Sequence, residues 1–405
     1  MKTPSKTYLF QTGHGKGLAK AEIEAVAKNL GEGKIIAEVE DGFVVEGNIP
    51  DARAQLNRMG SIVRIGEVLQ SGPAHMPLNF EEWVKNALEE KFKGYKGKMR
   101  YGLSMHPKNE ATLKKILIGA KKAVKALGNV RFVNKDFQNL SSVQAWHEHL
   151  LEQGAVELHL FKSMENEDEK GRWYLVKTLA IQDFEWYSKR DYDRPAKDAK
   201  NGMFPPKLAQ ILINLAEPEP GSTIMDPFCG SGTVLQEALL MDYAAWGSDL
   251  EKDMVEGTKT NLAWLSQKSK KGEQFEYTVI QADAGALSPK DLPSGSFTIV
   301  SETWLGPRLT KLPSPQELAK IQTDVEELFE NFLGHLKTVV KRPVTLVLTA
   351  PFHKEKNDRH FLPHLPEILA SHGTIIPLQA RERPSLFYER KDQTVAREIW
   401  KLKIG

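Results

Sequence analysis

The chain has 405 residues, of which 40% are hydrophobic and 27% charged, and its formal net charge is +2. This composition lies in the globular range, and no apolar run approaches the roughly 20 residues that span a bilayer. We expect two or three domains from the length and, because the N-terminal residues lack the apolar segment of a secretory signal, a cytoplasmic location. A single cysteine, Cys229, excludes an internal disulfide and a cysteine zinc cluster.

Residues 1–70 predict a small α+β, ferredoxin-like domain. Strands are expected at 8–13, 34–40 and 42–47 from their β-branched and aromatic content, and helices at 19–30 and 51–60 from their apolar spacing. The pattern breaks at Ser71-Gly72-Pro73, so a second α+β domain is predicted over residues 71–181.

The second domain predicts helices at 80–92, 111–128 and 142–154 and strands at 99–106, 131–134, 156–162 and 173–182, with an acidic hairpin loop at 164–171. It is strongly basic, because residues 91–140 contain 13 Lys or Arg and only two Asp or Glu. The cluster is either a solvated helix face or a surface that binds phosphates, since close cations gain from releasing the counterions of nucleic acid. The candidate RNA-binding residues are Lys96, Lys98, Arg100, Lys121, Lys122 and Lys125.

Residues 182–202 are rich in charge and are interrupted by Pro195, which predicts a linker. From residue 203 to 405, apolar strands alternate with helices. Strands are expected at 222–227, 244–250, 276–283, 296–302 and 344–351, and helices at 206–216, 232–242, 252–265 and 325–340. This alternation predicts an α/β domain with a mostly parallel, doubly wound sheet.

The segment STIMDPFCGSGTVLQEALL predicts a strand, a glycine loop and a helix. Glycines let the backbone approach a ligand, and the helix N-terminus presents free N–H groups, so the loop indicates a nucleotide-cofactor site. No lysine follows Gly232 and the loop lacks GxGxxG, which argues against a P-loop and a dinucleotide fingerprint.

Acids end three successive predicted strands: Asp226, Asp249 and Asp283. Asp249 stands about twenty residues beyond the loop, where a carboxylate can accept hydrogen bonds from ribose hydroxyls. Asp283 can accept from an adenine amine, with the Ala284 N–H free to donate to a ring nitrogen. A single Asp at a strand end is more often a helix cap, but three in register favour a cofactor site.

DPFCGSGT resembles motif I of class I S-adenosylmethionine-dependent methyltransferases, in the form found in RNA methyltransferases with an N-terminal THUMP domain. The segments RDYDRPAKDAKNGMFPPKLAQILINLA and YERKDQTVAREIW are similar to the linker with first helix, and to the closing hairpin, of the tRNA (guanosine-10-N2)-methyltransferases. The resemblance implies a Rossmann-like catalytic domain, a THUMP-like domain over residues 71–181, and S-adenosylmethionine as cofactor. The cofactor residues that it implies are Phe204, Pro205, Asp226, Phe228, Gly230, Ser231, Gly232, Asp249, Asp283 and Ala284.

That family places Asp/Asn-Pro-Pro-aromatic after its fourth strand, to accept the hydrogens of the substrate amine and to stack on the base. Here the fourth strand is followed by Ser301-Glu302-Thr303-Trp304-Leu305-Gly306-Pro307. Glu302 is the candidate acid and Trp304 the candidate stacking ring, while Ser301 and Thr303 complete the candidate catalytic loop. Because both prolines of the motif are missing, a less rigid loop is expected.

Three interpretations remain open. The first is a methyltransferase that acts on an exocyclic amine, guanine N2 in tRNA. The second is an enzyme that acts on rRNA, DNA bases or a protein, and the third is a catalytically impaired module that binds S-adenosylmethionine and RNA. No covalent intermediate is expected, because methyl transfer by direct displacement at the methyl carbon needs none. A metal site is not expected either, because His147 and His149 would point to different sides of the helix predicted at 142–154. The oligomeric state is left open.

Overall fold

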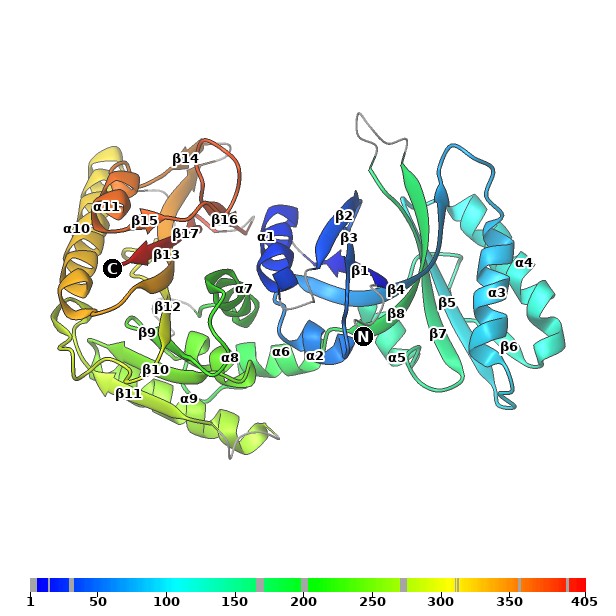
Figure 1. Cartoon of the computed structure of the whole chain (residues 1–405), viewed down its shortest axis with the longest axis horizontal. Helices are drawn as coiled ribbons and strands as arrows, with labels where there is room; N and C mark the ends of the chain where they lie inside the picture. Colours follow the sequence, from blue (N-terminus) through cyan, green and yellow to red (C-terminus); the bar gives the residue numbers. More distant parts are fainter. Residues whose placement is uncertain are drawn as a thin grey trace. The chain divides into compact units, whose positions relative to one another are not determined.

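The computed structural model describes residues 6–13, 15–28, 33–164, 171–197, 203–269, 275–309, 311, 313–355, 358–390 and 393–405. The chain divides into two compact units, each with its own sheet (Figure 1). The first unit comprises residues 1–57 and 61–184, and the second comprises residues 58–60 and 185–405.

The elements of the first unit are β1 Lys6–Thr12, α1 Lys16–Ala27, β2 Lys34–Val39, β3 Gly42–Gly47, α2 Ala52–Asn57, β4 Ile62–Pro73, α3 Phe80–Phe92, β5 Met99–His106, α4 Glu110–Ala123, the 3-10 helix η2 Val124–Leu127, β6 Val130–Phe132, α5 Ser142–His147, β7 Ala155–Lys162 and β8 Arg172–Ile181. The strands form one sheet in the order β2-β3-β1-β4-β8-β7-β5-β6. The predicted acidic loop at 164–171 falls mostly outside the described residues.

Strand β4 crosses the boundary predicted at residue 70. It pairs with β1 in its first half and with β8 as far as Gly72↔Trp173 and Pro73↔Arg172. Gly72 serves packing at this point, because a Cβ there would lie 2.9 Å from Leu78 Cδ2. The break at residues 71–73 is therefore a continuation of the strand, and the two predicted N-terminal regions share one sheet.

Helices α3 and α4 pack on β5, β7 and β8 through a core that includes Trp83, Leu88, Leu113 and Leu117. Both helices begin at an Asn cap. The Asn79 side chain accepts from the Glu82 N–H at 3.2 Å, and Asn109 accepts from the Thr112 N–H at 3.0 Å. The helix predicted at 142–154 is wrong beyond His147, where α5 ends, and His149 has a left-handed φ of +53°.

The elements of the second unit are α6 Phe184–Ser188, which starts one residue before the division, the π-helix η3 Lys189–Asp193, α7 Pro206–Ala216, β9 Thr223–Asp226, α8 Thr233–Leu240, β10 Ala244–Asp249, α9 Lys252–Lys268, β11 Tyr277–Gln281, the 3-10 helix η5 Ala284–Ala286, β12 Phe297–Glu302, α10 Pro315–Val339, β13 Val344–Glu355, β14 Asp358–His360, α11 Leu365–His372, β15 Thr374–Ile375, β16 Leu386–Tyr388 and β17 Val395–Ile404. The main strand order is β11-β10-β9-β12-β13-β17-β15.

The first five of these strands are parallel, and β17 is antiparallel to β13, which confirms the predicted doubly wound sheet. Strands β9 and β12 are neighbours, although β10 and β11 lie between them in the sequence. The chain therefore reverses its direction of winding between β9 and β12. Ligands of open α/β sheets bind at this point, outside the carboxyl ends of the strands.

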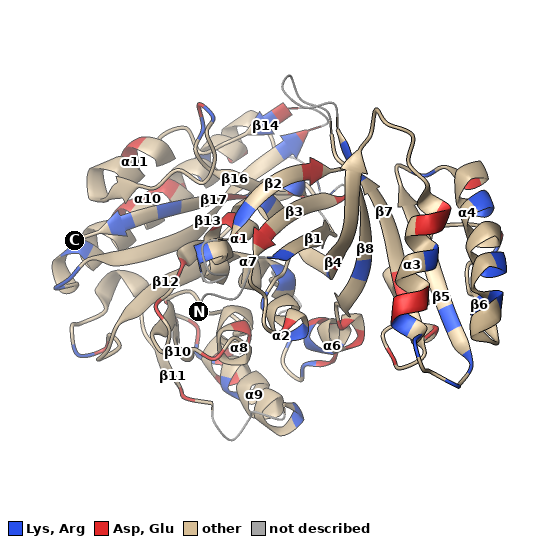
Figure 2. Ribbon diagram, turned by 45° about the vertical axis from the view of Figure 1, so that its right-hand side comes forward, with Lys and Arg blue, Asp and Glu red and all other residues tan. Residues whose placement is uncertain are grey.

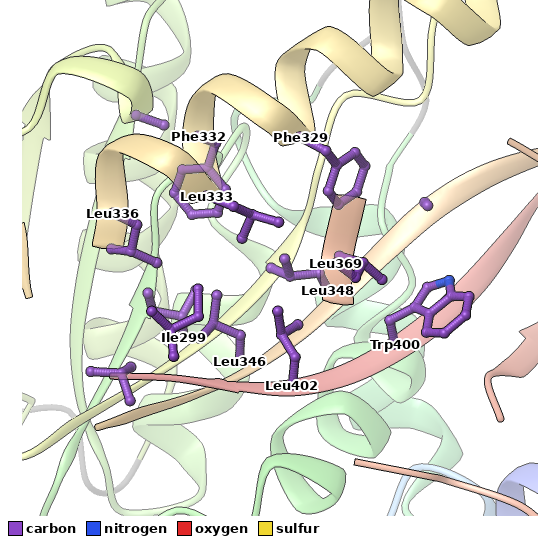
Figure 3. Close-up of a cluster of buried hydrophobic side chains, with 14 of the residues drawn as sticks. Ile299, Phe329, Phe332, Leu333, Leu336, Leu346, Leu348, Leu369, Trp400 and Leu402 are labelled. Atoms are coloured by element: carbon purple, nitrogen blue, oxygen red, sulfur yellow. The ribbon is translucent and has the colours of Figure 1, made fainter. Parts of the chain in front are cut away.

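Helices α10 and α11 cover one face of this sheet. Their apolar side chains meet Ile299, Leu346, Leu348, Trp400 and Leu402 of β12, β13 and β17 in a dry core (Figure 3). Helix α10 begins ten residues before its predicted start, because Ser314 and Glu317 form a capping box around Pro315. This core holds β12 in place up to the residue where the candidate catalytic loop begins.

The predicted linker is only partly a linker. Residues 185–194 belong to the second unit, and Arg190, 3% exposed, forms an ion pair with the fully buried Glu237 of α8 at 2.7 Å. Arg194, 1% exposed, donates to the Thr233 hydroxyl at 2.5 Å. Two of the charges of this segment, Arg190 and Arg194, are therefore buried against α8, whereas Glu185, Lys189, Asp193 and Lys197 are exposed.

Replacing Arg190 with methionine should lower the free energy of unfolding by about 3–5 kcal/mol, because the Glu237 carboxylate would stay buried without its partner. Urea denaturation measures the change. Replacing the neighbouring exposed Lys189 with methionine is the control and should change stability by less than about 0.5 kcal/mol. A loss of under about 1 kcal/mol for the Arg190 variant would mean that water reaches Glu237 in solution.

Candidate functional site

The glycine loop after β9 requires glycine at two positions. Gly230 and Gly232 have φ of +50° and +81°, a region that L-residues rarely adopt. A Cβ at Gly232 would also lie 2.8 Å from Thr258 Cγ2, whereas nothing lies within 4 Å of a Cβ at Gly230. The backbone at Gly230 can therefore approach a ligand closely, and Gly232 allows α8 to start against α9.

Asp226 is buried beneath this loop. Its carboxylate accepts from the Phe228 N–H at 3.1 Å and from the Ser301 hydroxyl at 2.5 Å. Burial, with a further effect from the negative charges of Asp249 and Glu302, raises the pKa of Asp226 to about 7. Asp226 therefore joins the end of β9 to the end of β12 at the reversal point.

Asp249 and Asp283 follow on the neighbouring strands. Asp249 accepts from the Gly230 N–H at 2.9 Å and from the Glu251 N–H at 3.0 Å, so it anchors the glycine loop. Asp283 caps η5 by accepting from the Gly285 N–H at 2.8 Å. The capping interpretation is thus correct for Asp283, and both carboxylates also line a cavity at the carboxyl ends of the strands.

This cavity has a volume of about 740 Å³, within the range of small-molecule sites. Most predicted site residues line it: Phe204, Asp226, Phe228, Gly230, Ser231, Asp249, Asp283, Ala284, Glu302, Thr303 and Trp304. Three others do not. Pro205 precedes the first turn of α7, Gly232 precedes α8, and Ser301 is fully buried.

The candidate catalytic loop is anchored by three consecutive side chains. Ser301 donates to Asp226 on β9, Glu302 accepts from Arg397 on β17, and Thr303 donates to the Thr349 carbonyl on β13 at 2.8 Å. These three hydrogen bonds constrain the start of the loop, and the expected lower rigidity stays a prediction. Side-chain hydrogen bonds to three strands supply constraints that two prolines supply elsewhere.

Beyond these anchors the loop turns toward the cavity. Trp304 is 42% exposed, so its ring face is free to meet a planar ligand. Gly306 has φ of +87°, and a Cβ there would lie 2.9 Å from Ile321 Cγ2, so a side chain at this position would strain the turn.

Arg397 is the main site residue that sequence reasoning missed. Its Nε donates to Glu302 Oε1, and the Arg397 and Glu302 side chains are 11% and 21% exposed. Burial raises the pKa of Glu302, and the positive charge of Arg397 opposes that rise. The Arg397 guanidinium also lies 5.8 Å from the Phe204 ring centre. The sequence feature that could have indicated Arg397 is the presence of an arginine within the strand VAREIW, among residues that are mostly apolar.

The cavity fits S-adenosylmethionine in chemistry and size. Asp249 offers a carboxylate to ribose hydroxyls, and the open Gly230 backbone suits close contact with the methionine part. Leu250, 67% exposed beside Asp249, offers an apolar surface at the rim. Across the cavity lie Glu302 and Trp304, so one pocket combines a nucleotide end with an acid and an aromatic ring.

The candidate RNA-binding residues lie at one end of the sheet of the first unit. Lys96 and Lys98 precede β5, Lys121 and Lys122 end α4, and Lys125 lies in η2 (Figure 2). All five are exposed and have no ion-pair partner within the described residues. Arg100, on β5, is only partly exposed.

No three His, Cys, Asp or Glu side chains within the described part of the chain are grouped as metal ligands. Among the same residues, no helix has the length and apolar character needed to cross a membrane.

Residues 194–356 match the RMKL-like methyltransferase domain family, and residues 76–260 match a DNA methylase family. Over 92 residues, 22% of this chain and 27% of the relative, the sequence is 40% identical to the tRNA (guanine(10)-N2)-dimethyltransferase of Methanothermobacter thermautotrophicus. Over 164 residues, 40% of this chain and 42% of the relative, it is 27% identical to the protein of the same name from Pyrococcus abyssi.

The chain thus aligns with less than half the length of these curated relatives. Among solved structures, TrmN from Thermus thermophilus is similar with a TM-score of 0.50 and 16% identity, covering 98% of this chain and 100% of that one, which supports the fold. Residues 194–356 therefore match a methyltransferase domain of the RMKL-like family, and segments of the chain are similar to tRNA (guanine-N2)-methyltransferases.

Proposed function

We propose that the protein transfers a methyl group from S-adenosylmethionine to an exocyclic amine of RNA, most specifically to N2 of guanine in tRNA. The observation that carries this proposal is the single cavity that joins Asp249 and the glycine loop to Glu302 and Trp304. The curated relatives are named as tRNA guanine-N2 methyltransferases, and their aligned segments support the choice of base.

The residues of the chain then divide the work. Asp249, Phe228, the glycine loop, Asp283 and Ala284 hold the cofactor, whose sulfonium supplies an electrophilic methyl group. Trp304 stacks on the base, and Glu302 accepts a hydrogen of the amine and orients its nitrogen.

With S-adenosylmethionine bound, the nitrogen lone pair would form the N–C bond as the S–C bond breaks, S-adenosylhomocysteine would leave, and the methylated amine would release one proton to solvent. Glu302 stabilises the positive charge that develops on the nitrogen.

The DNA methylase match keeps a DNA base as the second candidate substrate. Transfer of tritiated methyl groups to bulk tRNA, rRNA and DNA, each at equal nucleotide concentration, separates the candidates. We expect tRNA to accept most of the label. Preferential labelling of DNA would replace the proposed substrate class, and binding of cofactor without labelling of any acceptor would favour a non-catalytic module.

We further propose that the basic surface formed by Lys96, Lys98, Arg100, Lys121, Lys122 and Lys125 binds the phosphates of structured RNA. These side chains lie in the region predicted to be THUMP-like. Phosphate contacts of this kind position an RNA, whereas the pocket selects the base.

Reversing Lys121, Lys122 and Lys125 to glutamate should weaken tRNA binding at least tenfold and reduce the slope of log K against log salt by about 2 to 3. Affinity for S-adenosylhomocysteine should not change. Filter binding at several salt concentrations measures both RNA quantities. The matched control reverses the exposed Lys320, Lys337 and Lys341 of the second unit. Equal losses of tRNA affinity in both triple variants would mean that only net charge matters. Unchanged tRNA binding would mean that these lysines form a solvated surface without a role in RNA binding.

A further inference from the structure

The residue that departs from the expected motif, Glu302, is held by a residue 95 positions further along the chain. Arg397 lies on β17 opposite Pro351 of β13, and its side chain reaches Glu302 at the end of β12. Both residues line the cavity between the cofactor loop and Trp304. The hydrogen bond uses Glu302 Oε1, and no described residue has a hydrogen bond to Oε2, which can accept from a ligand.

An ionised acid in this position accepts the hydrogen of an amine strongly and stabilises the positive charge that develops on the nitrogen, whereas a protonated carboxyl is a weaker acceptor and carries no charge. Its surroundings act against ionisation. Burial disfavours the charged form of Glu302, and the carboxyl groups of Asp226 on β9 and Asp249 on β10 line the same cavity. Positive charge comes from Arg397 on β17 and from Arg308 in the loop after β12. Of these groups, Arg397 is the one hydrogen-bonded to Glu302.

We propose that Arg397 is the positioning residue of this site, which keeps Glu302 ionised and aimed so that Oε2 accepts the substrate amine. This inference rests on the proposed amine methylation. Arg397 acts through Glu302. Its charge-assisted hydrogen bond fixes the position of the acid, whereas in an Asp-Pro-Pro motif the prolines fix it through the backbone. The strand β17 is thereby part of the active site as well as of the sheet.

The test compares kcat/KM for tRNA at saturating S-adenosylmethionine from pH 6 to 8.5 in the wild type, Arg397→Met and Arg397→Lys. In Arg397→Met the acidic limb should move to higher pH by at least about one unit, so kcat/KM falls by about tenfold for each unit of displacement on the acidic side of the limb and by much less at pH 8.5. Arg397→Lys should keep the limb within about half a unit of the wild type. A lower rate by one factor at all pH values, or no change, would overturn the proposal.

Two controls separate the effect of Arg397 on Glu302 from effects that arise elsewhere in the protein. Arg383→Met breaks the ion pair with the buried Glu398 on the same strand, outside the cavity lining, and should leave the pH profile in place. Asp226, whose pKa is about 7, can also contribute to the acidic limb in every variant. The quantity compared is therefore the displacement of the limb between variants, not its absolute position. If Arg383→Met shifts the acidic limb as much as Arg397→Met does, the shift comes from a general disturbance of the β16–β17 pair, and the proposal fails.

A second readout needs no turnover. The carbonyl stretch of protonated Glu302, isolated as the infrared difference between the wild type and Glu302→Gln, gives the midpoint of its titration directly. The midpoint should rise by at least about one unit in Arg397→Met. If no RNA accepts a methyl group but the midpoint rises, the proposed function fails while the role of Arg397 in ionisation stands. An unmoved midpoint overturns that role even in an active enzyme.

Discussion

Replacing Asp249 with alanine should weaken the binding of S-adenosylhomocysteine by at least about 100-fold. Two hydrogen bonds from ribose hydroxyls to a carboxylate contribute about 3 kcal/mol together, which is more than a factor of 100 in Kd. The substitution also removes the acceptor that holds the Gly230 N–H at 2.9 Å. Isothermal titration calorimetry measures the change, and no methyl transfer should remain detectable at ordinary cofactor concentrations.

The matched control is Asp253→Ala, which removes an exposed acid from the first turn of α9, outside the cavity lining. It should leave the Kd within about a factor of two. Equal affinity in the wild type and the Asp249 variant would mean that the carboxylate does not contact the cofactor, and the assignment of the nucleotide end of the cavity would be wrong.

Replacing Glu302 with glutamine should lower kcat for methyl transfer by about 10²–10³ while cofactor affinity stays within about threefold. Glutamine keeps the size of the side chain but removes the negative charge that faces the amine as it becomes positive. Single-turnover transfer of a tritiated methyl group measures the chemical step.

Glu327→Gln, at an exposed position of α10 outside the cavity lining, makes the same chemical change and should leave kcat unchanged. Full activity in Glu302→Gln would exclude Glu302 from the mechanism. A parallel loss of cofactor affinity would show instead that Glu302 supports the cofactor end of the pocket.

The second unit follows its sequence pattern closely. Its parallel strands are continuous apolar runs between amphipathic helices, and β9, β10 and β12 end within a residue or so of the predicted positions. The start of α10 was missed because the capping box at Ser314 and Glu317 precedes a polar first turn, where apolar spacing carries little signal. Helices as short as η3 and α11 span too few turns for an apolar period to be recognised.

The structure of the first unit is harder to predict from the sequence, because its strands pair with strands that are distant along the chain. Strand β4 pairs with β8 more than a hundred residues later, so the turn-like residues Ser71, Gly72 and Pro73 could not be recognised as a strand end. The packing of part of the predicted linker against α8 could not be recognised for a related reason. A charged residue such as Arg190 is expected to be exposed when only the sequence is known. The structure shows that it is buried because it pairs with the buried Glu237.

The candidate site shows the same difference between residues with local sequence signals and residues with distant partners. Residues on strand ends and in the glycine loop were predictable, because their spacing is local and parallel strands bring their carboxyl ends to one edge. The partners of the catalytic loop were not, since Arg397 and Thr349 reach it across the sheet. Ser301, a predicted catalytic residue, is buried and donates to Asp226, a partner that the sequence did not reveal. The THUMP-like assignment and the individual roles of the site residues stay predictions.

Methylation of an exocyclic guanine amine can be observed by mass spectrometry of nucleosides from tRNA treated with the enzyme and S-adenosylmethionine carrying a deuterated methyl group. We expect labelled N2-methylguanosine or N2,N2-dimethylguanosine in tRNA treated with the wild type, and a loss of that signal with Glu302→Gln. Label on a different base, on a ring nitrogen or on ribose, with guanine N2 unmodified, would contradict the proposed reaction.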